Sequence, residues 1–342
     1  MTAEQLFCNS PNGVDVAVII VNYGTAELAV QAIESVIARS HGGRSVEMHL
    51  VDNASPGDDA ARLARALEAP FGAERITFYP EKVNHGFGRG NNLVLKALAN
   101  SSAPPRYVLL LNPDARLDNE VIQILADFLD SHPAATCAGA RISDPEGNPA
   151  TAAFRFPSLI SEFADTLAFG PVARLCADWT VPLSPVIDTM RVDWVSGAAV
   201  MFRFEPLVAA GGFDSAFFLY FEEVDLMRRL TAAGGEVWHV SEAHVLHSEG
   251  IATGIRGGAG APLRRPDYWY KSWAHYFRAS HGRVGGVAAA GVKMSAGLLN
   301  HLIALLRRRQ PSLPAGFLRD FPRVALPVLL RGVRSSRSGE GK

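Results

Sequence analysis

The stretch Tyr-Val-Leu-Leu-Leu-Asn-Pro-Asp-Ala-Arg-Leu-Asp at residues 107–118 decides how the rest of the chain is interpreted. Residues 108–111 form a continuous apolar run, which predicts a strand buried on both faces of a parallel sheet. Pro113 cannot continue the hydrogen-bond ladder, so the chain turns and leaves Asn112 and Asp114 at the carboxyl end of that strand. Ligands of open α/β sheets bind at this end.

The turn after this strand has the side chains that a divalent cation prefers. Mg²⁺ and Mn²⁺ bind carboxylate, water and phosphate oxygens, so an Asp on a stiff turn could hold either cation against a diphosphate. The alternative is an ordinary strand-to-helix turn, in which Asp118 or Asn119 caps the following helix.

Apolar segments on both sides of this strand predict the fold. Strands are expected at 14–21, 46–51, 76–79 and 136–142, and helices after Thr25, at 58–67, near Gly90 and at 120–129. This alternation predicts an α/β fold with a doubly wound, mostly parallel sheet flanked by helices. Residues 144–190 show little periodicity, so we expect loops and short helices there.

Two of the predicted strands end in further polar side chains. Asn22 follows the first strand and Asp52 follows the second. An Asp at such a strand end can accept the imide N–H of a uracil or thymine ring. The alternative is an Asx turn that caps the next helix.

Residues 84–92, Asn-His-Gly-Phe-Gly-Arg-Gly-Asn-Asn, predict a second binding segment. Glycines let the backbone approach a ligand closely, and a helix beginning here would direct N–H groups toward phosphate or sugar. The candidate residues are Asn84, Gly86, Gly88 and Asn91. The spacing of the glycines does not match a dinucleotide fingerprint, which argues against an oxidoreductase.

Small and aromatic residues in the second half of the chain predict a further part of the binding site. Trp194, Ser196 and Gly197 precede a predicted strand and leave room for a ligand.

An acidic run follows, with Glu222, Glu223 and Asp225 directly behind the aromatic residues 217–221. Carboxylates beside a core are costly without a function or a cation, and at a helix start they suit a general base. The alternative is a capping cluster on a solvated helix start. His247 ends a predicted strand, and its imidazole could join Asp114 on a cation.

The bulk composition is that of a globular protein with an unusual charge distribution. The chain has 342 residues, 48% hydrophobic, with a formal net charge of −1. Residues 263–342 hold 15 Lys and Arg against 3 Asp and Glu, a balance of +12, so the preceding residues carry −13. Three cysteines without paired spacing argue against disulfides or a zinc site, and the start of the sequence lacks signal-peptide features. We therefore expect a cytoplasmic protein.

The basic C-terminal segment predicts contact with an anionic surface. Residues 268–278 mix aromatic and basic side chains, as proteins do at lipid headgroups. Residues 284–306 are long enough to span a bilayer, but polar residues interrupt them, which favours an interfacial helix. The apolar residues between the cations favour the inner leaflet of a membrane over nucleic acid. The alternative is an ordinary helical bundle that packs on the catalytic domain or forms a homodimer.

Taken in order, these motifs resemble glycosyltransferase family 2, of the GT-A fold, and more closely its bacterial rhamnosyltransferase-like branch. The resemblance rests on seven segments between residues 14 and 250: 18–23, 51–55, 84–92, 111–114, 211–214, 221–226 and 244–247. It implies an N-terminal tail at 1–13, a catalytic domain at 14–262, with a nucleotide-binding half at about 14–118 and an acceptor half at about 190–262, and a helical basic extension at 263–342.

The resemblance also implies roles for individual residues. The donor would be a nucleotide-diphosphate sugar, with Asp52 at its base and with Asn112 and Asp114 in place of the family's metal-binding Asp-X-Asp motif. Glu223 would be the catalytic base, and His247 a further ligand of Mg²⁺ or Mn²⁺. This sequence departs from the family pattern at Asn112, usually Asp, and at the Glu222-Glu223 pair, usually Glu-Asp.

The expected reaction is a single displacement with inversion, because a carboxylate near the acceptor hydroxyl can remove its proton as it attacks. We expect transfer of rhamnose or another deoxysugar from a dTDP donor to a glycan carried on a polyprenyl diphosphate. A UDP-sugar donor is one alternative, and a non-catalytic scaffold that binds nucleotide sugar is another.

Overall fold

The computed structural model describes residues 13–68, 76–248 and 263–332. Their contacts divide the chain into two compact units. Unit 1 consists of Met1–Phe154, Pro182–Phe213 and Leu226–Arg256, and unit 2 of Arg155–Val181, Asp214–Asp225 and Gly257–Lys342. Two segments before residue 263, at 155–181 and 214–225, belong to unit 2, and the predicted domain boundaries stay a prediction.

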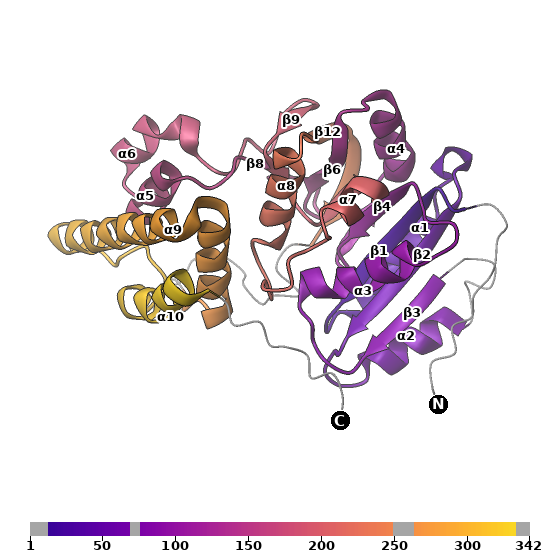
Figure 1. The fold of residues 1–342 in the computed structure, drawn as a ribbon, viewed down its shortest axis with the longest axis horizontal. Coiled ribbons are helices and arrows are strands. Elements are labelled where there is room, and N and C mark those ends of the chain that lie inside the picture. Colours follow the sequence, from indigo (N-terminus) through magenta and orange to yellow (C-terminus); the bar gives the residue numbers. More distant parts are fainter. Residues whose placement is uncertain (1–12, 69–75, 249–262, 333–342) are drawn as a thin grey trace. The chain divides into compact units, whose positions relative to one another are not determined.

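Unit 1 is built on a mixed sheet with the strand order β3-β2-β1-β4-β11-β6-β12-β5 (Figure 1). Its strands are β1 Val16–Asn22, β2 Val46–Asn53, β3 Ile76–Glu81, β4 Tyr107–Leu111, β5 Ala115–Leu117, β6 Ala135–Ser143, β7 Pro149–Ala150, β9 Met190–Val192, β11 Ala199–Arg203 and β12 Glu236–His247. A separate pair joins β8 Ala153–Phe154 to β10 Trp194–Val195.

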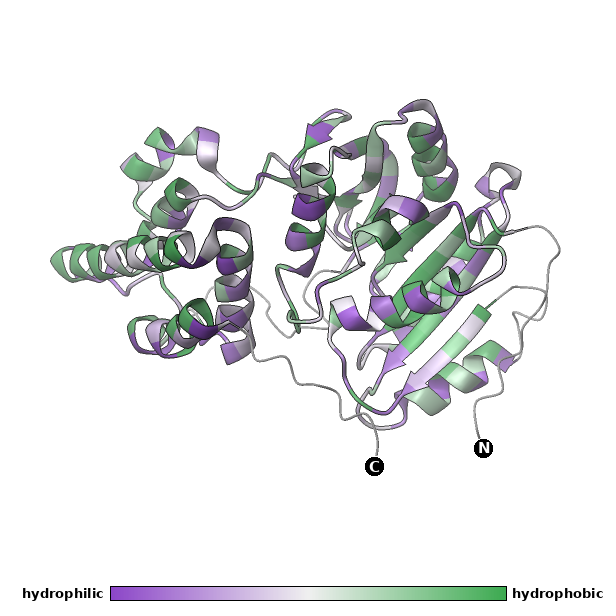
Figure 2. Cartoon of the chain, in the orientation of Figure 1, coloured by the Kyte–Doolittle hydropathy of each residue, from purple (hydrophilic) through white to green (hydrophobic). Residues whose placement is uncertain are grey.

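Helices cover both faces of this sheet, as the sequence predicted. They are α1 Ala26–Ile37, α2 Asp59–Glu68, α3 Phe87–Ala99, α4 Val121–Ser131, α7 Phe204–Ala209 and the part of α8 Glu222–Ala232 from Leu226 on, with a 3₁₀ turn at His41–Gly43. Side chains of α1, α2 and α4 form one core with Leu109 and Leu111 of β4, while those of α3, α7 and α8 form the other with Val108 and Leu110. The continuous apolar run is therefore buried on both sides, and Figure 2 shows the hydrophobic colour along these strands.

The sequence predicted parallel neighbours for β4, and only one of its two neighbouring strands is parallel. Its pairing with β1 is parallel, but its pairing with β11 is antiparallel. The following helix also differs from the alternative interpretation of the turn, since α4 begins after Glu120 and neither Asp118 nor Asn119 caps it. A short strand, β5, lies between the turn and the helix.

Unit 2 is helical, and it contains α5 Leu159–Leu167, α6 Gly170–Leu175, a 3₁₀ turn at Ala177–Trp179, α9 Asp267–Leu306 and α10 Phe317–Arg331. Helix α9 packs against α5 and α10 (Figure 1). Gly282, with φ of 70°, breaks α9 into two helical parts.

The aromatic residues of 268–278 lie mostly in the core of this unit. Tyr270, Trp273, Tyr276 and Phe277 are fully buried, and Trp273 packs edge-to-face on Phe321 of α10. The expectation that this stretch forms an exposed lipid-headgroup belt is therefore wrong for these four side chains. Their composition reflects a packed aromatic bundle instead.

Candidate active site

The carboxyl ends of β1, β2 and β4 form the floor of the site in unit 1. The parallel register of β1 and β2 places Asn22 beside Asp52. Because β4 is the other parallel neighbour of β1, Asn112 follows at the same edge of the sheet. Three candidate residues from distant parts of the chain thus share one edge.

Asp114 and His247 are in direct contact at this edge. The Nε2 atom of His247 lies 3.1 Å from Oδ1 of Asp114 and 3.4 Å from Nδ2 of Asn112. The antiparallel pairing of β12 with β5 aligns His247 with Ala115, the residue after Asp114. His247 and Asp114 thus meet although 133 positions separate them in the sequence. Both side chains are largely buried: 11% of the His247 side-chain surface and 4% of the Asp114 side-chain surface are exposed.

This pair fits the ligand requirements of Mg²⁺ or Mn²⁺. Neighbouring ligands of an octahedral cation with bonds of about 2.1 Å lie about 3.0 Å apart, which matches the Asp114–His247 separation. The described residues contain no group of three or more His, Cys, Asp and Glu that could hold a metal. A cation here would therefore take its remaining ligands from phosphate and water, as Mg²⁺ commonly does.

Asp52 is held in a network of hydrogen bonds. Its Oδ1 accepts from Nδ2 of Asn22 at 3.0 Å and from Oγ of Ser55 at 2.6 Å, and its Oδ2 accepts from the Ser55 N–H at 3.3 Å. Asn22 in turn accepts from the N–H and hydroxyl of Thr25. The contacts with Ser55 are those of a local turn, but Asp52 also accepts from Asn22 on the neighbouring strand and does not cap α2, which begins at Asp59. The role of Asp52 at the nucleotide base stays a prediction.

The glycine segment is shaped by Asn53, which the sequence analysis did not select. Its side chain donates to Oδ1 of Asn84 and to the carbonyl of Gly86, both at 3.1 Å, and accepts from the N–H of His85 at 2.9 Å. Helix α3 begins at Phe87 after Gly86, three residues earlier than predicted. The sequence did contain a signal for Asn53, because it is a second polar residue that directly follows Asp52 at the end of the same strand.

The first turn of α3 contains a buried polar group without a partner. Asn91 donates from Nδ2 to the carbonyl of Phe87 at 3.0 Å, whereas its buried Oδ1 has no hydrogen-bond partner among the described residues. Gly88 is buried on the same turn. An unsatisfied buried acceptor calls for an explanation, and a ligand hydroxyl or N–H would supply one.

Ser196 is linked to Asn112 through Ala198, whereas Trp194 packs against another aromatic ring, and no contact recorded for Gly197 tests its predicted role. Oγ of Ser196 accepts from the N–H of Ala198, whose carbonyl accepts from the N–H of Asn112 at 2.9 Å. The ring of Trp194 stacks on Phe154 at a centroid distance of 4.0 Å. One face of this ring is therefore already covered.

The three carboxylates Glu222, Glu223 and Asp225 form the first turn of α8 and belong to unit 2. Oε2 of Glu222 and Oε2 of Glu223 are buried and have no hydrogen-bond partner among the described residues. Burial raises the pKa of both carboxyls, and the Glu223 charge raises the pKa of Glu222 further, well above its usual value. Their convergence with Asp114 of unit 1 stays a prediction.

The chain enters α8 through two residues in an unusual conformation. Tyr220 and Phe221 both have φ of 70°, a left-handed region that costs about 1–3 kcal/mol for residues other than glycine. Contacts with α9 hold this segment, since Oγ of Ser272 donates to the carbonyl of Leu219 at 2.9 Å. Phe221 also packs against Trp269, with ring centroids 5.8 Å apart.

Comparisons with known proteins identify relatives of the chain. Residues 17–176 match the family model described as glycosyl transferase family 2. The N-acetylglucosaminyl-diphospho-decaprenol L-rhamnosyltransferase of Mycobacterium tuberculosis (strain H37Rv) is 30% identical over 227 residues, which cover 62% of this chain and 69% of that protein. Rhamnosyltransferase WbbL of Escherichia coli (strain K12) is 26% identical over 165 residues, 48% of this chain and 61% of that protein.

Solved structures share the fold. The mannosyltransferase PcManGT of Pyrobaculum calidifontis, in complex with GDP-Man and Mn²⁺, has a TM-score of 0.50 at 14% identity and covers 96% of this chain and 91% of its own. GalNAc-T7 with UDP, GalNAc and Mn²⁺ has a TM-score of 0.53 at 13% identity, with coverage of 95% and 59%.

Proposed function

Because the chain belongs to glycosyltransferase family 2 and is a glycosyltransferase of the GT-A fold, we propose that it transfers rhamnose or another deoxysugar from a dTDP donor to a lipid-linked glycan. The relatives named for L-rhamnosyl transfer support the sugar, and the decaprenol-linked acceptor in one of those names supports the lipid. The observation that carries the proposal is the contact between Asp114 and His247 at the carboxyl end of β4.

In this proposal Asp114 and His247 hold a divalent cation, Mg²⁺ or Mn²⁺. The cation would offset the negative charge that builds on the departing nucleoside diphosphate. Nδ2 of Asn112 lies 3.4 Å from the Nε2 atom of His247, whose lone pair would go to the cation in the loaded site. Two solved structures of the same fold contain Mn²⁺, which supports this choice of cofactor.

The donor lies along the ends of β1 and β2 and the first turn of α3. Asp52 and Asn22 bind the nucleotide base, and the segment from Asn84 through Gly86 and Gly88 approaches the diphosphate and sugar. The unsatisfied Oδ1 of Asn91 accepts a hydroxyl of the donor.

Glu223 acts as the general base in this proposal. Burial raises the pKa of both carboxyls, and because like charges in one buried turn repel, the pair loses its first proton more readily than its second; the proposal assigns that first charge to Glu223. Glu223 then accepts the proton of the acceptor hydroxyl as that oxygen attacks the anomeric carbon from the face opposite the diphosphate. Asp225 supports the turn, Trp194, Ser196 and Gly197 face the acceptor, and the product has inverted configuration.

Unit 2 brings the enzyme to its lipid-linked acceptor. Helix α9 has the length and composition of a membrane span, but much of it is buried. Its last turns expose Leu305 and Leu306, at 74% and 75%, immediately before the cations 307–309. This pattern favours peripheral association with the cytoplasmic leaflet, either as a monomer or as a homodimer.

The proposal is tested by incubating the purified chain with dTDP-rhamnose and membrane extract, followed by mass spectrometry of the lipid fraction. We expect a mass gain of one deoxyhexose that requires Mg²⁺ or Mn²⁺ and is lost with EDTA. UDP-glucose and UDP-N-acetylglucosamine serve as competing donors in parallel reactions. Transfer from a UDP sugar alone would contradict the donor, and no transfer from any donor would contradict the enzymatic role.

A further inference from the structure

Unit 2 contains a cavity of about 270 Å³, and none of the residues that line it has been assigned a role above. It is enclosed by α5, α9, the start of α10 and the segments that precede α9 and α10. Its polar lining comes from Glu162, Asp165, Thr166, Arg265, Lys293 and Ser312. Aromatic side chains complete the wall, among them Trp269 and Phe221, the residue directly before Glu222.

One acid and one base in this cavity neutralise each other. Nζ of Lys293 lies 2.5 Å from Oε2 of Glu162 and 3.2 Å from Oγ1 of Thr166. The ammonium also lies over the ring of Trp269, 5.8 Å from its centroid. Because this pair is buried and hydrogen-bonded, it forms a fixed part of the wall.

The other two charged groups keep their hydrogen-bonding capacity. Neither Asp165 nor Arg265 makes a hydrogen bond or ion pair with the described residues; Arg265 is half-buried, whereas Asp165 is exposed at the rim of the cavity. The guanidinium of Arg265 instead stacks over Trp269, with Cζ 4.1 Å from the ring centroid. Partial desolvation and the nearby Glu162 raise the pKa of Asp165, and burial lowers that of Arg265.

A third unsatisfied group belongs to the same wall. The hydroxyl of Tyr270 is buried and has no hydrogen-bond partner among the described residues. The cavity thus offers an unused carboxylate acceptor, an unused guanidinium donor and an unused hydroxyl. The buried hydroxyl of Tyr270 is costly without a partner, and a ligand could complete it together with the half-buried guanidinium and the carboxylate at the rim.

We infer that this cavity binds one pyranose ring of the glycan acceptor, an inference that rests on the proposed function. A sugar presents hydroxyls that both donate and accept, and it has an apolar face for an aromatic wall. A phosphate would meet the carboxylates of Asp165 and Glu162, and a polyprenyl chain would leave Asp165 and Arg265 unsatisfied. The volume lies near the lower limit of small-molecule pockets, about 300 Å³, which suits a single sugar residue.

The location of Phe221 connects this site to the proposed chemistry. Phe221 lines the cavity and is followed at once by the acidic pair of α8. A ring held against Phe221 would therefore lie on the segment that carries the proposed base. The cavity would position the acceptor, so its residues should affect acceptor binding more than the chemical step.

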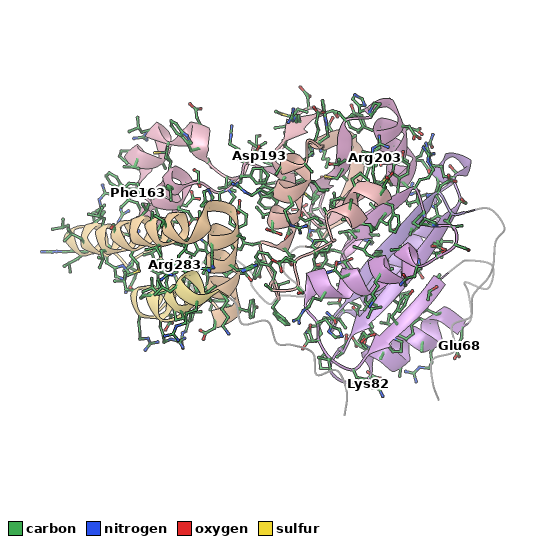
Figure 3. The ribbon with its side chains drawn as sticks, viewed as in Figure 1. Glu68, Lys82, Phe163, Asp193, Arg203 and Arg283 are labelled. Carbon is green, nitrogen blue, oxygen red and sulfur yellow. The ribbon has the colours of Figure 1, made fainter. Side chains whose placement is uncertain are left out.

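The test compares matched substitutions in the full chain. Asp165→Asn and Arg265→Gln remove one unused group each. Asp178→Asn and Arg283→Gln change exposed residues of the same unit outside the cavity, and Arg283 lies on α9 (Figure 3). Binding is followed by saturation-transfer NMR with methyl N-acetyl-β-D-glucosaminide as the probe, and a circular-dichroism melt verifies that each variant is folded.

We expect probe signals with the wild type and both controls, and their loss with Asp165→Asn and Arg265→Gln. In transfer assays these two variants should raise the KM for the acceptor by about tenfold, with the donor KM unchanged. Retained probe signals in both variants, equal effects on donor and acceptor KM, or binding of inorganic pyrophosphate in place of the sugar would overturn the inference. If the two variants lose sugar binding, the site is supported even when no transfer is detected. If the two variants transfer normally with an unchanged acceptor KM, the site is refuted while the proposed function stands.

Discussion

At the scale of single residues, the Asp114–His247 contact makes the most direct prediction. Asp114→Asn keeps the shape of the side chain but removes the charge that would bind a cation. We expect kcat/KM to fall by about 10²–10³-fold and the activity to require a higher Mn²⁺ concentration. The measurement is the initial rate of transfer as a function of Mn²⁺ concentration.

Asp118→Asn is the matched control for this substitution, because Asp118 is exposed and lies only four positions away. We expect wild-type activity from it. Wild-type metal dependence in Asp114→Asn would show that the carboxylate does not bind the cation.

Glu223 makes a prediction about pH. A base works only when it is ionised, and burial raises the pKa of this carboxyl from the usual 4.5. The rate should therefore fall as the pH drops through the raised pKa, and the acidic limb of the kcat profile should lie above pH 4.5. Glu223→Gln should lower kcat by about 10²–10⁴-fold and remove this limb.

The control for Glu223→Gln is Glu205→Gln, at an exposed position of α7. Its profile should match that of the wild type. An unchanged acidic limb in Glu223→Gln would assign the titration to another group.

Residues of the site differ in how well the sequence could identify them. The contact between Asp114 and His247 was predictable because Asp114 lies in the turn after β4 and His247 ends β12, and polar side chains at such positions gather at one edge of the sheet. Asn53 was not, because its role is internal: it bridges β2 to Asn84 and Gly86, and a pattern of residue types does not reveal hydrogen-bond partners.

At the scale of elements, the fit of α3 on the sheet makes a prediction about stability. A Cβ atom at Gly90 would lie 2.9 Å from Cγ1 of Val21, closer than real contacts allow. Gly90→Ala should push α3 away from β1 and lower the free energy of unfolding by about 1–3 kcal/mol. Thermal unfolding followed by circular dichroism measures the change.

Gly291 provides a contrasting substitution, since it is helical and a Cβ there would meet nothing within 4 Å. Gly291→Ala should stabilise the protein by about 0.5–1 kcal/mol, because alanine favours the helix. A stable Gly90→Ala variant would mean that α3 can shift without loss of packing.

The sequence predicted the elements of the sheet better than their directions. The strands at β1, β2 and β4 have apolar residues on both faces, and this pattern identified them. The same pattern cannot distinguish a parallel neighbour from an antiparallel one, so the insertion of β11 between β4 and β6 was missed. The start of α3 was missed because Asn84 holds the N–H of Gly86 and allows the helix to begin earlier.

At the scale of the whole molecule, the charge of the C-terminal segment makes a prediction about membranes. Arg307, Arg308 and Arg309 are exposed beside exposed leucines. Replacing all three with Gln should weaken binding to phosphatidylglycerol vesicles by about 100-fold, since each cation contributes about 1 kcal/mol. Co-sedimentation at low and high salt measures the binding.

Arg62→Gln, an exposed change in unit 1, should leave vesicle binding unaltered. Salt should weaken wild-type binding more than that of the triple variant. Equal binding by both proteins would exclude an electrostatic contribution from this segment.

The aromatic stretch at 268–278 shows a limit of composition as a guide. Aromatic and basic residues occur together both at lipid headgroups and in tightly packed helical bundles. Only the position of α10 distinguishes the two cases, because Phe321 covers Trp273 and so makes this stretch a core. The division into two units was likewise hidden, since unit 2 collects three segments that are far apart in the sequence.

The left-handed pair Tyr220 and Phe221 has a consequence for anyone who shortens this protein. Their backbone shape is maintained by partners near the start of α9, such as Ser272 and Trp269. A fragment that stops before residue 263 would lose these partners while keeping every acidic residue of the motif. If Glu223 is the base, such a fragment should be inactive even toward a water-soluble acceptor, because the C-terminal helices hold the backbone that leads into α8.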